Sequence, residues 1–204
     1  FLSQLDRNYM NELIMYNKVL QQRNVLLKKY SSIKDAQDLL SVYDNNLCEY
    51  GKKIHLKRKE CIQNIIKIVQ KYYNVISNRS EYVDIKYQSQ LYNGDFLKLL
   101  EDSRQKDQIL TYTTNGIHRD DFVFSINEHS LKKSGSQGQQ KTFLIALKFA
   151  YFEILKDILK KKPILLLDDI FDKLDHDRVE QIIRIFNEKE FGQIFITDTS
   201  KDRV

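Results

Sequence analysis

The spacing of apolar residues predicts long helices over the first third of the chain. Between residues 5 and 29 the apolar positions recur at helical spacing, and Asp6 is placed to cap the first turn. From residue 33 to residue 76 the apolar positions follow a nearly continuous heptad pattern, which is interrupted only at Arg58. We therefore expect a long arm helix that packs along another helix.

The period then changes to that of β-strands. Residues 82–87 alternate apolar and polar side chains as a half-buried strand does. A short helix capped by Asp95 is expected to end near residue 108. Strand patterns follow at 107–114 and 121–131.

The last part of the chain alternates helices with strands. The expected elements are a helix at 139–160, a strand at 163–168, a helix at 175–187 and a strand at 192–197. Such alternation is typical of an α/β fold with a mainly parallel sheet and covering helices. We place a domain boundary near residue 107, which gives a helical arm domain at 1–107 and an α/β domain at 108–204.

Composition and charge narrow the class of protein. Hydrophobic residues make up 42% and charged residues 30% of the chain, as in a folded soluble protein. Apolar runs fall short of the roughly 20 residues of a membrane span, and the first residues do not resemble a signal peptide. We therefore expect a cytoplasmic protein without a membrane partner. Cys48 and Cys61 are too few for a disulfide framework or a zinc site.

The strongest chemical signal is the acidic pair Asp168 and Asp169. The pair ends the apolar run 163–167, and the carboxyl ends of parallel strands border the crevice where α/β sheets bind ligands. Asp168 suits Mg²⁺, which takes one or two carboxylates together with water and phosphate. Asp169 can orient an attacking water. From these residues alone, two acids that merely end a strand remain the alternative.

A second signal lies at the start of the helix near residue 139. Ser136 and Gly138 would gather backbone N–H groups at a helix N-terminus, where anions bind favourably. Gly138 would let a phosphate approach the backbone closely. By itself such a loop equally fits an ordinary helix cap.

These motifs together resemble those of the ATP-binding-cassette ATPases. Ser136-Gln137-Gly138-Gln139 is similar to their signature motif, residues 165–169 to their Walker B strand, 173–175 to their D-loop and 195–199 to their switch strand. Within that superfamily the chain most resembles the RecF family, which is related to the SMC ATPases. The segments that support this resemblance are GIHRDDFVFSINE, GSQGQQKTFLIALKFA and YNKVLQQRNVLLK. The implied fold is the C-terminal part of an SMC-like ATPase head, preceded by the helical arm.

The resemblance implies roles in a site shared by two subunits. Ser136 and Gly138 would contact the γ-phosphate of ATP held by a second copy of the protein, while Gln137 and Gln139 complete the loop. Asp175 would cross the dimer interface. Gly138 is then expected to matter only in the ATP-bound dimer, so Gly138→Asp should spare folding.

The resemblance also implies slow ATP hydrolysis. Asp168 would hold Mg²⁺ through water, and Asp169 would orient the hydrolytic water where most relatives have the longer Glu. Thr197 stands where many relatives have a His, and a hydroxyl cannot act as an imidazole.

A phosphate-cradling P-loop is not found in the sequence. Gly51-Lys52 is the only Gly-Lys pair, and it lies inside the predicted arm helix. We interpret the chain as a C-terminal portion that lacks this segment, and we expect it to bind ATP poorly and to hydrolyse almost none by itself.

A basic segment on the arm helix predicts a DNA contact. The net charge of +5 lies within residues 1–107, and five cations fall within about two helical turns. The alternative is a solvated helix face. The predicted DNA-contacting residues are Lys52, Lys53, Lys57, Arg58 and Lys59.

The family resemblance extends to partners. It implies a homodimer in the ATP state that binds single-stranded and gapped duplex DNA and works with the RecO and RecR mediators to load recombinase in repair, replication and the SOS response. His118 and Arg119 would support nucleotide-linked positioning; from the residues alone they form a loop pair bonded to Asp120 or Asp121. Ile117 replaces the usual Pro of this segment.

Two other interpretations remain open at this point. Another SMC-like ATPase of the RecN or cohesin type would have a much longer arm than the roughly 100 residues found here. A non-catalytic coiled-coil interaction module would use the acidic pair only to end a strand.

Overall fold

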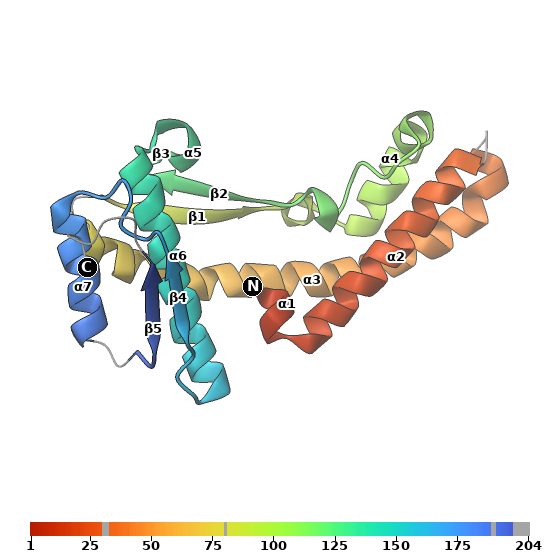
Figure 1. Ribbon diagram of the computed structural model, residues 1–204. Coiled ribbons are helices and arrows are strands. Elements are labelled where there is room, and N and C mark those ends of the chain that lie inside the picture. The colour runs from red at the N-terminus through yellow and green to blue at the C-terminus, as the bar shows by residue number, and fades with distance from the viewer. Residues whose placement is uncertain (30–32, 80, 189–190, 198–204) are drawn as a thin grey trace. The chain divides into compact units, whose positions relative to one another are not determined.

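The computed structural model describes residues 1–29, 33–79, 81–188 and 191–197, and the chain divides into two compact units (Figure 1). The first unit comprises Phe1–Cys61 and Tyr87–Phe122, and the second comprises Ile62–Lys86 and Val123–Val204. The boundary expected near residue 107 therefore falls inside the first unit. The reason is that Asp107 is buried there in an ion-pair network with residues of the arm helices.

The first unit is built from helices. They are α1 (Leu2–Leu5), α2 (Arg7–Lys29), the part of α3 (Ile33–Ile76) that precedes residue 62, and α4 (Phe96–Leu110). Asp6 separates α1 from α2, and its carboxylate accepts the N–H of Tyr9 at 2.9 Å, which confirms the predicted cap. The core consists of Tyr9, Tyr16, Val19, Leu47, Cys48, Ile54, Phe96, Leu100 and Ile117.

The heptad pattern of the arm helix is confirmed with a shift at its beginning. Leu40, Leu47 and Ile54 are fully buried and seven residues apart. Leu39, which the pattern placed inward, is 46% exposed. The buried positions at the beginning of α3 are therefore Ala36 and Leu40 instead of Leu39.

The strand predicted at 107–114 is wrong. Helix α4 continues to Leu110 and ends at Thr111, whose φ of 61° is left-handed. The chain then turns back, and the backbone N–H and hydroxyl of Thr114 both donate to Asp107, at 2.9 and 2.7 Å. The apolar pattern was misleading because Ile109 is 80% exposed. Short 3-10 turns, η1 (Gln90–Asn93) and η2 (Ile117–Arg119), flank this region in sequence.

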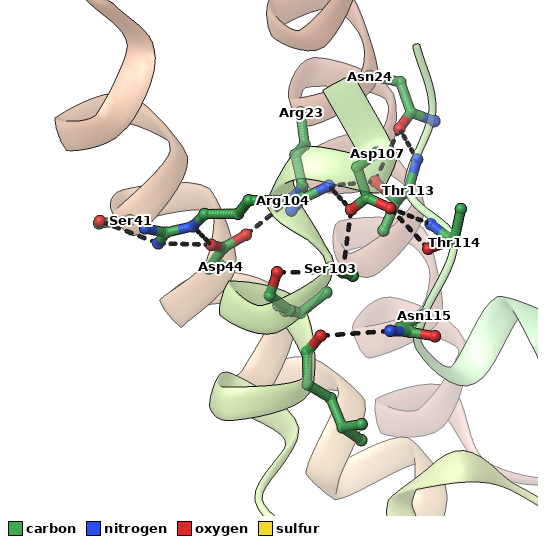
Figure 2. A network of polar contacts seen from close by, with 12 residues as sticks. Arg23, Asn24, Ser41, Asp44, Ser103, Arg104, Asp107, Thr113, Thr114 and Asn115 are labelled. Atoms are coloured by element: carbon green, nitrogen blue, oxygen red, sulfur yellow. Dashed lines mark hydrogen bonds and ion pairs between the residues drawn. The ribbon is translucent and has the colours of Figure 1, made fainter. Parts of the chain in front are cut away.

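A buried ion-pair network joins three helices of the first unit (Figure 2). The guanidinium of Arg23 on α2 donates to Asp44 on α3 and to Asp107 on α4, each at 2.7 Å. All three side chains are fully buried. Arg104 adds a second cation to Asp44 at 2.8 Å, and Thr113 accepts from Arg23 at 2.9 Å. Because removing one member would leave a buried charge unpaired, the network ties the helices together.

A three-stranded sheet has the order β1-β2-β3. The division between the two units falls within its first two strands. Its strands are β1 (Val83–Gln88), β2 (Asp121–Ile126) and β3 (His129–Ser130), with α5 (Leu131–Ser134) after them. β2 and β3 pair antiparallel through a two-residue turn in which Asn127 and Glu128 both have positive φ, as a hairpin of this kind requires. The strand predicted at 82–87 is thus confirmed. The strand predicted at 121–131 is confirmed only over 121–126, because Asn127 and Glu128 turn the chain back and Leu131 begins α5.

The second unit also contains the parallel pair predicted from the last part of the chain. Its elements are α6 (Gln137–Leu159), β4 (Leu165–Asp168), α7 (His176–Glu188) and β5 (Ile194–Thr197). β4 and β5 run parallel. One face of β4 is buried through Leu165 and Leu167, whereas Leu166 and its β5 partner Phe195 are 69% and 56% exposed on the other face.

Two global properties follow from the described residues. None of their helices is both long and apolar enough to cross a membrane. Cys48 and Cys61 are free thiols, as predicted, and burial raises the pKa of Cys48 to about 12 and that of Cys61 to about 11. Both thiols are therefore protonated and weakly nucleophilic at neutral pH.

Candidate functional site

The acidic pair lies at the carboxyl end of β4, where the sequence placed it. Asp168 is in register with Thr197 at the end of β5, and the Thr197 hydroxyl donates to Oδ1 of Asp168. Both residues are exposed. One carboxylate oxygen of Asp168 is engaged by Thr197, and the other is available to a ligand at the strand ends. Residues 198 and 199 of the expected switch strand lie outside the described residues.

Asp169 has a left-handed backbone conformation and a buried carboxylate oxygen. Its φ of 47° is left-handed, a conformation that costs energy for a residue with a Cβ. The surrounding chain holds it there: its N–H donates to the Thr197 carbonyl at 3.0 Å, and Nζ of Lys141 donates to its carbonyl oxygen. Its Oδ1 is buried, and none of the described residues donates a hydrogen bond to it. A buried carboxylate oxygen without a donor is the atom that a water or a ligand would satisfy.

The start of α6 is a capping box. Ser136 Oγ accepts the N–H of Gln139 at 3.2 Å, and Gln139 Oε1 accepts the N–H of Ser136 at 2.8 Å. Helix α6 begins at Gln137, two residues earlier than predicted, so Gly138 lies in its first turn. Ser136 and Gln137 are both exposed at this cap, so their polar groups are accessible to an anion.

The structure brings the start of α6 close to the segment that follows the acidic pair. A Cβ added to Gly138 would lie 3.1 Å from the carbonyl oxygen of Lys173, closer than side chains normally pack. Lys141, in the same helix, reaches the Asp169 carbonyl. The two motifs that the sequence singled out 30 residues apart are therefore neighbours in one unit.

Asp175 has a clear role within the chain. Its Oδ1 accepts the N–H of Arg178 at 2.9 Å at the start of α7, and its Oδ2 pairs with the Arg178 guanidinium at 3.1 Å. The side chain of Asp175 is nevertheless 63% exposed, so it remains accessible to another molecule.

Asp168 is the exposed carboxylate of this site that could contact a metal ion. No three His, Cys, Asp or Glu side chains converge among the residues of the described ranges. A single exposed carboxylate such as Asp168 suits Mg²⁺, because that ion completes its octahedral shell with water and phosphate oxygens.

The basic segment of α3 is largely engaged within the first unit. Arg58 donates to Asp120 and to the Ile117 carbonyl, both at 2.8 Å, and its side chain is 15% exposed. Lys57 pairs with Asp6 at 2.9 Å and with Glu12 at 3.5 Å. In this arrangement neither cation is directed to a phosphate.

The other three predicted cations are more accessible. Lys53 pairs with Glu49 at 2.8 Å and Lys52 lies 3.6 Å from Asp95, but all these side chains are about half exposed. Lys59 lies over the ring of Tyr92, 5.4 Å from its centroid. Exposed ion pairs of this kind exchange readily for phosphate contacts.

Sequence reasoning missed the contacts of His118 and Arg119. His118 does not bond Asp120 or Asp121; its Nδ1 lies 3.0 Å from the Tyr16 hydroxyl and its Nε2 lies 3.1 Å from the Thr113 carbonyl. Burial lowers the pKa of His118. Arg119 stacks over the ring of Tyr112. The partners of His118 lie at sequence separations of 102 and 5 residues, and no local pattern indicates the first.

Comparisons with known proteins agree on one family. The chain is 49% identical over 204 residues to the DNA replication and repair protein RecF of Flavobacterium johnsoniae, and 45% identical over 202 residues to that of Cytophaga hutchinsonii. The matches cover 99% and 98% of the chain but 56% and 54% of these relatives, so the chain spans about half their length. No family model matches the chain.

The solved structures point the same way. The structure described as the recombination mediator protein RecF-ATP in the RecFOR pathway superposes with a TM-score of 0.84 at 31% identity, over 98% of this chain and 56% of that one. A second RecF structure, with ATPrS, gives a TM-score of 0.81 at 32% identity. The predicted α/β fold of the ATP-binding-cassette type is thus confirmed.

Proposed function

The chain belongs to the RecF family, of which it represents a C-terminal portion, and from this premise we propose that it forms part of an ATP-dependent DNA-binding protein of replication and repair. The observation that supports this most directly is the acidic pair at the end of a parallel strand, with one buried carboxylate oxygen of Asp169 left without a donor. The left-handed φ of 47° at Asp169, held by the bond from its N–H to the Thr197 carbonyl, sets the direction in which this carboxylate leaves the strand end.

The proposed chemistry is phosphoryl transfer to water. When bound, ATP with Mg²⁺ would supply the reactive phosphate and the metal charge. Asp168 would hold the hydrated metal through the carboxylate oxygen that Thr197 does not contact, while the Thr197 hydroxyl fixes the other oxygen. Asp169 accepts a hydrogen bond from the attacking water at its unsatisfied Oδ1. The short Asp side chain favours slow ATP hydrolysis. Slow hydrolysis would prolong the ATP-bound state in which the protein binds DNA.

The start of α6 serves the other half of a composite site. Ser136 and Gly138 present a hydroxyl and close backbone to the γ-phosphate of ATP bound by a second copy, with Gln137 at the rim and Gln139 fixed by the capping box. Asp175, exposed beside this helix start, contacts the same partner. Two such sites close a homodimer.

The DNA contact involves the accessible cations of the arm. Lys52, Lys53 and Lys59 lie on exposed positions of α3, whereas Lys57 and Arg58 stabilise the unit from within. The proposed substrates are single-stranded and gapped duplex DNA, and the proposed partners are RecO and RecR, with recombinase loading as the outcome. The solved relatives are described as the recombination mediator protein RecF of the RecFOR pathway, which supports RecO and RecR as the proposed partners.

The decisive experiment measures ATP turnover and ATP-dependent dimerisation in the full-length protein that contains this chain. Asp169→Asn should abolish turnover while the ATP-bound dimer persists longer, because the amide cannot orient the water as a carboxylate does. Asp172→Asn, a nearby acid outside the proposed site, is the matched control and should leave both unchanged. Unaltered hydrolysis in Asp169→Asn would refute the assignment, and failure of the unmodified protein to dimerise with ATP would favour the interaction-module alternative.

A further inference from the structure

A polar cluster in the second unit centres on Glu81, a residue between α3 and β1 that no sequence motif indicated. Its Oε1 accepts from the Gln139 amide at 2.8 Å and from the Arg178 guanidinium at 3.0 Å, and its Oε2 accepts from the Tyr73 hydroxyl at 2.5 Å. Tyr73 belongs to α3, Gln139 to α6 and Arg178 to α7. One carboxylate therefore joins three helices of the unit.

Arg178 extends this cluster to the segment before α7. Its Nη1 donates to the Thr142 hydroxyl at 2.7 Å, and its Nε pairs with Asp175 at 3.1 Å. The side chains of Glu81 and Arg178 are each 13% exposed, so their interaction is less screened by water than a surface ion pair. The three nitrogens of the guanidinium, with one contact each, thus fix Thr142 on α6, Asp175 and Glu81 relative to one another.

Gln139 connects the cluster to the cap of α6. Its amide oxygen accepts the Ser136 N–H as part of the capping box, and its amide nitrogen donates to Glu81. Both ends of this side chain are therefore used, and its rotation would break the cap and the Glu81 contact together. Gly138 packs against the Lys173 carbonyl next to it, which is a second tie between the cap and residues 173–175.

The electrostatics of Glu81 agree with this geometry. Burial alone would raise the pKa of Glu81, but the hydrogen bonds from Gln139 and Tyr73 and the charge of Arg178 outweigh it and lower the pKa. The carboxylate is thus charged at neutral pH, and it compensates a guanidinium that is itself largely removed from water.

We propose that Glu81 and Arg178 are positioning residues that hold the cap of α6 and residues 173–175 in a single arrangement, so that a second subunit meets both segments at once. The proposal rests on the function proposed above, because both segments are the ones assigned to the partner's nucleotide. Neither residue touches the nucleotide. They order both segments before the second subunit binds, so that dimerisation does not carry the entropic cost of ordering them.

The first test is independent of dimerisation and uses the full-length protein. Hydrogen exchange measured by mass spectrometry should rise together in peptides covering 136–142 and 173–178 when Glu81 is replaced by Gln, since the neutral amide keeps the size of the side chain but loses the ion pair. Glu180→Gln, an exposed acid on the same helix as Arg178, is the control. Unchanged exchange in both segments, or a rise in only one of them, would overturn the proposal.

The second test measures the consequence for assembly. Glu81→Gln should weaken ATP-dependent dimerisation about tenfold, the size expected for one coupled polar network, while ATP affinity of the monomer stays within about twofold. Arg178→Gln should weaken dimerisation at least as much, because it also removes the contacts to Thr142 and Asp175. The effects of the two substitutions should be less than additive in the double variant, because they share the Glu81–Arg178 pair. Arg178→Lys, which retains the charge, should recover part of the effect.

The outcomes separate the two proposals. If the unmodified protein does not dimerise with ATP, the proposed function fails, and the exchange experiment still decides whether Glu81 couples the two segments. If the unmodified protein dimerises and Glu81→Gln dimerises equally well, the positioning role is wrong and the proposed function stands.

Discussion

The buried network around Arg23 leads to a large and specific effect on stability. Replacing Arg23 by Met keeps most of the side-chain volume but removes the cation that pairs with Asp44 and Asp107. Asp44 retains Arg104 as a partner, whereas Asp107 keeps only neutral donors from Ser103 and Thr114. A fully buried carboxylate is then left without a compensating charge.

The magnitude follows from burial. Breaking a buried ion pair by removing one partner costs about 3–5 kcal/mol, and Arg23 has two such partners at 2.7 Å with no exposed side-chain area. The exposed pair of Lys53 with Glu49 is the matched control, since surface pairs between adjacent helical turns contribute about 0.3–0.5 kcal/mol. We therefore expect Arg23→Met to be several times more destabilising than Lys53→Met.

The assay is urea unfolding of the chain followed by far-ultraviolet circular dichroism, with hydrogen exchange to locate the effect in α2 and α4. A double-mutant cycle measures the coupling between Arg23 and Asp107 directly. Asp107→Asn should destabilise the unmodified chain, but in the Arg23→Met background it should cost nothing or restore stability, because it removes the orphaned charge. A loss below about 1 kcal/mol for Arg23→Met, or simple additivity in the cycle, would refute the argument.

Two further predictions concern the first unit. Replacing Lys52, Lys53 and Lys59 by Glu in the full-length protein should weaken duplex binding and reduce the slope of log affinity against log salt concentration by about 0.9 per lost phosphate contact. The control substitution Lys148→Glu should change neither quantity. Equal slopes for the triple variant and the unmodified protein would exclude these lysines as DNA contacts. Because burial lowers the pKa of His118, its protonation favours the unfolded chain, so unfolding free energy should fall as pH drops below the ordinary value of 6.5. His118→Gln should flatten that dependence between pH 7.5 and 5.5 in urea titrations, and an unchanged dependence would contradict this assignment.

The helices and strands could be predicted where side-chain periodicity records which face is buried. The bounds of the 44-residue α3 were predicted because Leu47, Ile54 and Val69 recur along one buried face, although Leu40 and not the expected Leu39 is buried at its beginning. The prediction failed at 107–114 because periodicity does not register the hydrogen bonds that Thr114 makes to Asp107, nor the left-handed end of α4. The apolar residues of this segment are exposed and do not form a strand.

Sequence patterns could not predict polar contacts between residues that are far apart in the chain. Arg58 was predicted to face DNA because it is one of five clustered cations, but its partner Asp120 lies 62 residues further along. Glu81 and Arg178 are 97 residues apart and belong to no motif. The motifs, whose spacing is local, indicated the residues that we propose to touch a nucleotide, but they did not indicate the residues that contact those segments from a distance.

Gly138 shows how the structure changes the design of a test. Sequence reasoning assigned its missing side chain to a phosphate on a second subunit, so that Gly138→Asp would affect only the dimer. In the folded chain a Cβ at this position would lie 3.1 Å from the Lys173 carbonyl, and an added carboxylate would also face that oxygen's negative partial charge. The substitution would therefore displace residues near 173 in the monomer as well. A weakened Gly138→Asp dimer could arise from either cause, whereas Glu81→Gln adds no atoms at the interface and separates the internal arrangement of the two segments from their contact with a partner.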